Sequence, residues 1–324
     1  MEKFKRFLTH EGLYQNIEDS IAKMTRENVS RSDLKLVAAA LRELRHTFRV
    51  FAPYRDRHKV TVFGSARSKK TDPLYKMAKH FAKEIVHQGY MVMTGAGPGI
   101  MHAAQEGAGS ESSFGLNIRL PFEQGANPII REDTKLINFK YFFTRKLTMV
   151  KESDALVLFP GGFGTQDELF ETLTLLQTGK SSPKPVICVD KKQGTYWKTW
   201  QQTNLMMLLK QKLVSREDIN LLHFTDSVED AVSHIVRFYE NYHSIRFYNR
   251  WLLIRLQRLP SDEILKKLTK KFKDILLGGT IHPSPTHIAY DPELGHLHLK
   301  TLRMRFNQRN YGRLRQLINA LNKY

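Results

Sequence analysis

The sequence of 324 residues is poor in the features that mark several protein classes. Its single cysteine, Cys188, cannot form an internal disulfide, and its 13 histidines show no metal-ligand spacing. No apolar run is long enough to span a bilayer, and the N-terminal segment lacks the apolar stretch of a secretory signal. These absences predict a cytoplasmic protein without a membrane partner or a metal, in which Cys188 is a small buried residue of a strand.

Two catalytic signatures are also missing. There is no GxxxxGK[ST] sequence, which disfavours a P-loop nucleotide hydrolase. There is no Gly-x-Ser-x-Gly elbow either, which disfavours a serine hydrolase.

Acidic residues are in short supply: 32 Asp and Glu stand against 51 Lys and Arg, a net charge of +19. The excess is concentrated in residues 242–324, where sixteen Lys and Arg face five Asp and Glu, a net +11. Such a segment attracts polyanions, so a polyanion or a regulatory nucleotide is a candidate partner there. A solvated surface that keeps the protein soluble is the plainer interpretation of the same charge. The arginines spaced to bind a nucleotide are Arg303, Arg305, Arg309, Arg313 and Arg315.

Short apolar runs alternate with helical patterns between residues 59 and 241. This alternation predicts an α/β domain, a Rossmann-like doubly wound parallel sheet that binds its ligand at the carboxyl ends of the strands. Residues 1–58 form a separate segment of helices, expected at 2–8, 13–24 and 34–51. Residues 242–324 read as a small α+β appendage of order β-α-β-β-α, with strands at 251–256 and within 294–306.

Three glycine turns follow strands of the expected sheet. They lie at residues 64–66, 95–99 and 161–165, so they can converge on one crevice. Glycine lets the backbone approach a ligand closely, and the free N–H groups at a helix start bind anions. The turn at 95–99 alone is compatible with a plain tight turn, and its GxGxG spacing is weak support for a dinucleotide. The expected anion-binding residues are Gly64, Ser65, Gly95, Gly97, Gly99, Gly161, Gly162, Gly164 and Thr165.

Charged side chains accompany the third turn. Glu168 follows it by about one helical turn, whereas Asp167 fits the plainer role of favouring the helix dipole. Arg145 and Lys146 lie on the preceding helix, where Arg145 could meet an anion or be an ordinary surface residue. We expect Arg145 at the edge of a buried stripe made of Phe142, Phe143, Leu147 and Val150.

The sequence PGGFGTQDE at 160–168, with Arg145–Lys146 upstream, resembles the LOG ("lonely guy") family, whose older members were labelled lysine decarboxylases. The likeness covers about residues 32–240 and includes GAGPGIM at 95–101 and GLNIRLPFEQGANP at 115–128. That last segment is similar to the longer bacterial branch of the family. No lysine stands in a recognisable setting for pyridoxal phosphate, so the decarboxylase label finds no support in the residues.

The resemblance implies an enzyme that hydrolyses the N-glycosidic bond of nucleoside 5′-monophosphates, such as AMP or cytokinin riboside monophosphates, to free base and ribose 5-phosphate. It implies Arg145 and Glu168 as the catalytic pair, with Lys146, Gly162 to Thr165 and Thr174 around the nucleotide. It also implies a homodimer and no cofactor. Cleavage of this bond builds positive charge on the ribose, which a carboxylate such as Glu168 can stabilise.

A binding module is the alternative from another functional class. The basic segment 242–324 suits a nucleic-acid partner, although it contains neither a helix-turn-helix pattern nor an aromatic-interleaved RNA signature. A non-catalytic module that binds nucleotides or nucleic acid therefore stays open on sequence grounds.

Overall fold

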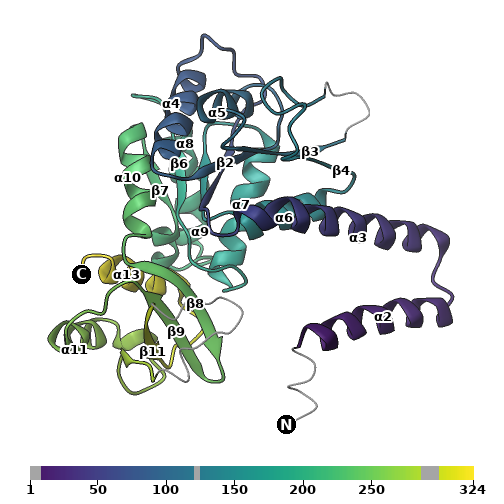
Figure 1. Cartoon of the computed structure of the whole chain (residues 1–324). Helices are drawn as coiled ribbons and strands as arrows, with labels where there is room; N and C mark the ends of the chain where they lie inside the picture. Colours follow the sequence, from purple (N-terminus) through teal and green to yellow (C-terminus); the bar gives the residue numbers. More distant parts are fainter. Residues whose placement is uncertain (1–8, 120–124, 286–298) are drawn as a thin grey trace. The chain divides into compact units, whose positions relative to one another are not determined.

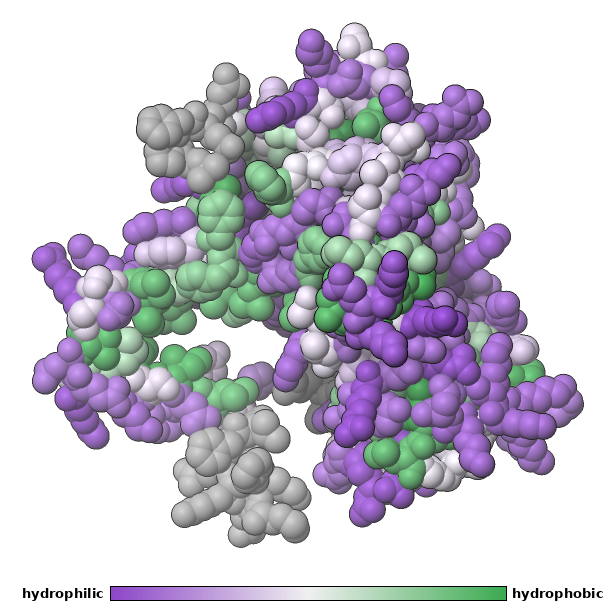
Figure 2. All heavy atoms as spheres, turned by 180° about the vertical axis from the view of Figure 1, so that it is seen from behind, coloured by the Kyte–Doolittle hydropathy of each residue, from purple (hydrophilic) through white to green (hydrophobic). Residues whose placement is uncertain are grey.

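The computed structural model describes residues 9–119, 125–285 and 299–324, and the chain divides into two compact units, residues 1–49 and 50–324. The first unit contains α2 (His10–Arg26) and most of α3 (Arg31–Phe51), which confirms two of the three expected N-terminal helices (Figure 1). The third, at 2–8, lies outside the described residues. Figure 2 shows hydrophobic side chains in green on both helices, and several of them are about half exposed, including Leu13, Ile21 and Leu41.

The second unit is built on a seven-stranded parallel sheet, which confirms the predicted fold class (Figure 1). Its inner strands are almost entirely buried, as expected where helices cover both faces of a parallel sheet, whereas the strands at its two edges are partly exposed. Cys188 lies in the sixth strand and is fully buried. The strands are β1 (Lys59–Phe63), β2 (Met91–Thr94), β3 (Ser113–Ile118), β4 (Leu136–Phe139), β5 (Ala155–Leu158), β6 (Val186–Val189) and β7 (His223–Thr225).

The helices cover the sheet in two layers. On one face α4 (Pro73–His87), α5 (Ile100–Ala108) and α10 (Val228–Phe238) bury their apolar sides. On the other face lie α6 (Phe142–Glu152), α7 (Phe163–Gln177) and α8 (Tyr196–Trp200), with α9 (Met206–Lys210) further along the chain. No described helix is both long and apolar enough to cross a lipid bilayer.

The strand order β4-β3-β2-β1-β5-β6-β7 fixes where a ligand would bind. The chain builds outward from β1 to β4 on one side and then from β5 to β7 on the other, so its direction reverses between β1 and β5. Ligands of doubly wound folds bind outside the carboxyl ends of the strands at such a reversal. The turns at 64–66 and 161–165 follow these two strands directly.

The C-terminal part forms a second, antiparallel sheet of order β10-β11-β9-β8. Its elements are β8 (Tyr242–Tyr248), β9 (Trp251–Leu256), α11 (Asp262–Lys271), β10 (His282–Pro283), β11 (Lys300–Met304) and α13 (Tyr311–Leu321). The predicted order β-α-β-β-α was therefore wrong in two places among the described residues. Strand β8 was missed, and the His/Pro-rich stretch taken as a spacer contributes the short strand β10.

Candidate functional site

The three glycine turns meet at the carboxyl ends of β1, β2 and β5. Backbone hydrogen bonds join them: the Ser65 N–H donates to the Pro160 carbonyl at 3.1 Å, and the Ile100 N–H donates to the Ser65 carbonyl at 3.0 Å. The turn after β1 is thus held between the turns after β2 and β5. The structure brings these predicted residues to one place.

The close packing of the turns requires glycine at two positions. A Cβ atom at Gly161 would lie 2.0 Å from the Thr165 hydroxyl oxygen, so Gly161 allows the chain to fold back over the first turn of α7. Gly99 has a φ of 64°, and a Cβ there would lie 2.2 Å from the Ser65 carbonyl oxygen. By contrast, nothing lies within 4 Å of a Cβ placed on Gly162 or Gly164, so the start of α7 is open to a ligand.

The structure also brings Arg145 to these turns. Its Nε donates to the Leu116 carbonyl at 2.7 Å, which directs the side chain from α6 across the end of β3. A Cβ at Gly95 would lie 2.4 Å from Nη2 of Arg145, so the guanidinium occupies the space that glycine leaves. Sequence spacing alone could not reveal this pairing of Gly95 with Arg145.

The buried side of α6 differs from the prediction. Phe142, Phe143 and Leu147 are 51%, 49% and 52% exposed, so only Val150 of the expected stripe is buried. The spacing of apolar residues predicted the wrong buried side for α6, because the helix turns mainly small and polar residues toward the sheet. The other buried residues of α6 are Thr144, Thr148 and Met149.

Glu168 lies in the second turn of α7 with its side chain only 6% exposed. Burial raises the pKa of its carboxyl to about 7, although Lys146 and Arg145 favour the charged form and lower it. Its Oε2 atom is buried and has no hydrogen-bond partner. A buried carboxyl oxygen without a partner is costly for stability and is found preferentially at functional sites.

Lys146 contacts carboxylates rather than an open anion site. Its Nζ lies 2.8 Å from Asp167, 2.8 Å from Glu171 and 3.6 Å from Glu168. These carboxylates raise the pKa of the Lys146 amine against the effect of burial, which lowers it. Lys146 therefore tethers α6 to α7 beside Glu168, and Asp167 has an ion-pairing role that the helix-dipole reading did not foresee.

Thr174 lies apart from the turns. It is exposed, twelve residues beyond Gly162 along α7, and its hydroxyl donates to the Phe170 carbonyl at 2.8 Å. Twelve residues of helix span about 18 Å, so the structure does not bring Thr174 to the glycine turns. Gly97 lies in the turn after β2, where a Cβ would lie 2.6 Å from the Met101 methyl carbon.

Sequence reasoning missed a buried amide that holds the turn after β2. The Nδ2 group of Asn127 lies within hydrogen-bond distance of the Ala96 carbonyl at 3.0 Å, the Gly97 carbonyl at 3.1 Å and Oε1 of Gln105 at 2.6 Å. Ala96 is held at a φ of 61°, which L-residues rarely adopt. The only signal in the sequence was a polar residue inside the segment GANP.

A second missed group supports the turn after β5. The Tyr196 hydroxyl donates to the Gly161 carbonyl at 2.5 Å and accepts from Nε2 of Gln166 at 2.6 Å. Trp200 donates its Nε1–H to Oε1 of Gln166 at 2.9 Å. Helix α8 thus fixes the turn through a chain of side chains that are distant in sequence.

The comparison with family models agrees with the resemblance seen in the motifs. The family model described as "Possible lysine decarboxylase" matches residues 93–235, which run from β2 to α10 and include two glycine turns, Arg145 and Glu168. No curated protein that was compared matches the chain.

Three solved structures show a weak likeness. The molybdenum cofactor carrier protein of Chlamydomonas reinhardtii is 20% identical, with a TM-score of 0.38 over 55% of this chain and 96% of its own. The molybdenum cofactor binding protein of Rippkaea orientalis is 22% identical, with a TM-score of 0.38 over 55% and 95%. DNA processing protein A of Helicobacter pylori is 16% identical, with a TM-score of 0.38 over 56% and 82%. Likeness at this level carries no information about function.

The amide clamp gives a stability prediction. Asn127→Ala leaves the Gln105 side chain and two carbonyls of the turn without their shared donor, so it should lower the free energy of unfolding by about 2 kcal/mol. Urea denaturation of the two proteins measures this difference. Asn138→Ala removes one exposed hydrogen bond with Asn117 and should change stability by less than about 0.5 kcal/mol. Equal effects of the two substitutions would contradict the clamp.

The raised pKa of Glu168 gives a second prediction. Because the folded state holds this proton more tightly than the unfolded state, ionisation destabilises the fold as pH rises from about 4.5 to about 7. Glu168→Gln removes that penalty, so at pH 8 the variant should be more stable than the native protein by up to about 3 kcal/mol. The gain should vanish near pH 4.5, as thermal melts at several pH values will show.

Glu263→Gln is the matched control, since Glu263 is 76% exposed and pairs with Lys267 on α11. It should change stability little at any pH. A Glu168→Gln protein that is less stable than native at pH 8 would show that the carboxylate is well compensated.

Proposed function

We propose that the chain is a nucleotide N-glycosidase, because residues 93–235 match the family model described as possible lysine decarboxylase and the motifs around Arg145 and Glu168 resemble the LOG family. It hydrolyses nucleoside 5′-monophosphates of the AMP or cytokinin riboside type to the free base and ribose 5-phosphate. The glycine turns at 64–66, 95–99 and 161–165 bind the nucleotide, and Arg145 and Glu168 carry the chemistry.

The unpartnered carboxyl oxygen of Glu168 carries this proposal. It is buried beside a helix start whose backbone is open at Gly162 and Gly164. Phosphate bound by the N–H groups of that helix start would place the sugar toward the interior of the site. The site thus offers an anion cradle and a desolvated carboxylate within two turns of the same helix.

The reaction needs few groups. Water supplies its oxygen to C1′ of the ribose as the bond from C1′ to the base nitrogen breaks, and the departing base takes up a proton. Ionised Glu168 stabilises the positive charge that develops on the ribose and accepts a proton from the attacking water. Arg145 supplies the cation beside the nucleotide, and binding of the phosphate holds the sugar in place.

Amine chemistry at Lys146 is disfavoured by its surroundings. A lysine that forms a Schiff base must lose its proton to act as a nucleophile. The carboxylates of Asp167, Glu168 and Glu171 hold Lys146 protonated by raising its pKa. Three described lysines are buried, namely Lys59, Lys135 and Lys184, and each lies at the amino end of a strand, away from the turns. Burial lowers the pKa of Lys184 to about 8, and its amine donates to the Val150 carbonyl at 2.8 Å.

A panel of nucleoside monophosphates scored for released base and ribose 5-phosphate tests the proposal. We expect turnover of at least one of them, with kcat/KM rising with pH to a plateau and a midpoint near pH 7, because ionised Glu168 is the active form. Glu168→Gln should lower kcat by about a hundredfold or more, while Glu263→Gln on α11 should leave it unchanged. Intact nucleotides across the whole panel would refute the assignment.

We also propose that the chain forms a homodimer through the exposed apolar residues of α6 and α7. Phe163 is 95% exposed and Phe170 is 42% exposed, and they add to the half-exposed Phe142, Phe143 and Leu147. Apolar side chains gathered in this way mark an interaction surface. Light scattering should give twice the chain mass of 37.7 kDa, and Phe143→Glu should shift the protein toward monomer. A native protein of monomer mass would exclude the dimer.

A further inference from the structure

The antiparallel sheet of the C-terminal part has two unlike faces. One face packs Leu252, Ile254 and Leu302 against the apolar sides of α11 and α13. The registers β8–β9 and β9–β11 place the intervening residues on the opposite face. We call it the arginine face, and its described residues are Ser244, Arg246, Tyr248, Trp251, Leu253, Arg255, His282, Thr301, Arg303 and, just past β11, Arg305.

The registers align these residues in rows across the sheet. Arg246, Leu253 and Arg303 face one another on three neighbouring strands, and His282 continues the row on β10. The next row contains Arg255, whose Nη1 donates to the Ser244 hydroxyl at 3.4 Å. Four arginines therefore stand on one sheet face, although Arg255 is only 3% exposed and so is not available to a partner. Arg250 adds an exposed cation in the turn between β8 and β9.

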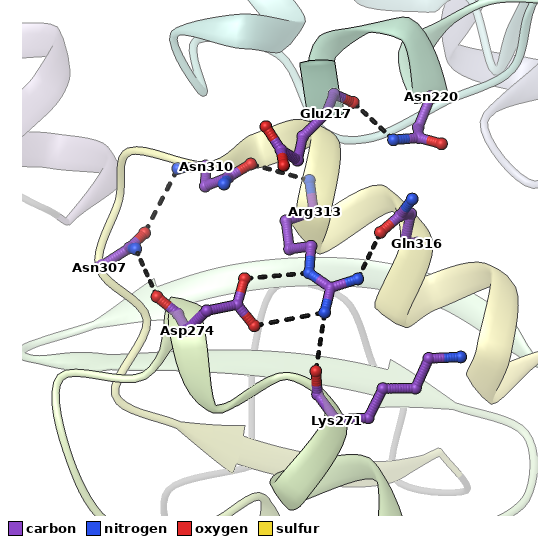
Figure 3. Close-up of polar contacts among 8 residues, drawn as sticks. All are labelled: Glu217, Asn220, Lys271, Asp274, Asn307, Asn310, Arg313 and Gln316. Atoms are coloured by element: carbon purple, nitrogen blue, oxygen red, sulfur yellow. Dashed lines mark hydrogen bonds and ion pairs between the residues drawn. The ribbon is translucent and has the colours of Figure 1, made fainter. Parts of the chain in front are cut away.

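Described carboxylates of the C-terminal part lie elsewhere. Asp262 and Glu263 begin α11, on the far side of the sheet. Asp274 pairs with Arg313, whose Nε lies 3.0 Å from it and whose other nitrogens donate to Gln316 and to the Lys271 carbonyl (Figure 3). On the arginine face, Nε of Arg305 is buried without a hydrogen-bond partner. Positive charge is thus in excess among the described groups there.

Four of the five arginines expected from sequence to bind a nucleotide divide into two groups, and the fifth, Arg309, is exposed in the loop before α13. Arg313 is engaged by Asp274, and Arg315 is only 2% exposed, so neither is available to a polyanion. Arg303 and Arg305 remain on the sheet face. The structure therefore moves the candidate anion surface from α13 to β11 and its neighbours.

Aromatic rings accompany the charge. The Arg303 guanidinium lies over the Trp251 ring at 4.7 Å, and the His282 ring lies edge-on to Trp251 at 5.9 Å. Tyr248, paired with Trp251 across the strands, is 43% exposed. A basic surface with rings on which bases can stack is the chemistry that binds single strands, whereas acidic lipid needs charge alone.

We propose that the arginine face binds single-stranded nucleic acid, with phosphates paired to Arg303 and Arg305 and bases stacked on Trp251 and Tyr248. This surface is separate from the glycine turns, which follow strands of the other sheet. It provides a second binding activity that does not depend on the proposed hydrolysis.

Fluorescence polarisation of the full chain with labelled 20-nucleotide oligothymidine and oligouridine tests the proposal, and the two probes distinguish DNA from RNA. We expect binding to at least one at low salt. Arg303→Ala with Arg305→Ala should weaken it at least tenfold and lower the salt slope by about 1.4, since each phosphate contact contributes about 0.7 for a single strand. Trp251→Leu should weaken it about fivefold or more without altering that slope.

The matched control is Lys266→Ala with Lys270→Ala, which removes the same charge from exposed positions on α11. It should change the affinity less than twofold. If the double alanine variant fails to fold, Arg303→Lys with Arg305→Lys takes its place. This variant keeps both charges, so the salt slope of its binding should equal that of the native protein. Absence of binding at low salt, equal loss in both double alanine variants, or equal binding of an abasic oligomer of the same length would overturn the proposal.

Discussion

The structure of the candidate site depends on the close contact of three strand-to-helix turns. Ser65 donates to one neighbouring turn through its backbone N–H and accepts from the other through its carbonyl, so the turn after β1 locks those after β5 and β2. Contact at this distance is possible only because Gly99 and Gly161 lack side chains. The strand order determines where the site lies, because it places β1 and β5 side by side at the point where the direction of the sheet reverses.

Two opposing electrostatic effects meet at Glu168. Burial favours its protonated form, while the cations of α6 favour its charged form, and the carboxyl is left with a pKa of about 7. Lys146 lowers the pKa of Glu168 only in part, because its amine also pairs with Asp167 and Glu171. If Lys146 paired with Glu168 alone, the carboxylate would be ionised and fully neutralised, and its power to respond to charge on a ligand would be lower.

The sequence predicted the parallel sheet well because its inner strands are short apolar runs that alternate with helical patterns, and three of them end in glycine turns. It also predicted that the turns meet, since the carboxyl ends of parallel strands share one edge. It could not predict which side of α6 is buried, because three of that helix's apolar residues are exposed and its buried side includes two threonines. Asn127 and Tyr196 were missed for another reason: each acts on a turn at least thirty residues away in sequence.

In the C-terminal part, too, the sequence did not reveal every element. Strand β8 was missed because its alternation of apolar and polar residues is confined to Ile245, Arg246 and Phe247, which is shorter than the four to eight residues that indicate a strand. Arg315 explains why this part belongs to the same compact unit as the parallel sheet. Its buried guanidinium donates to the Lys184 carbonyl at 2.7 Å, approaches Nε2 of His234 at 3.1 Å and lies over the Phe238 ring at 4.1 Å.

Neutral partners surround this buried arginine. Burial lowers the pKa of His234 to about 3, so its ring is uncharged at neutral pH and can accept the hydrogen bond. Burial also lowers the pKa of Arg315, but only to about 10, so the guanidinium keeps its charge. A charge held by a carbonyl, a neutral imidazole and a ring is satisfied without any carboxylate. Arg315 thus serves to join α13 to β6 and α10 and is not available to an outside partner.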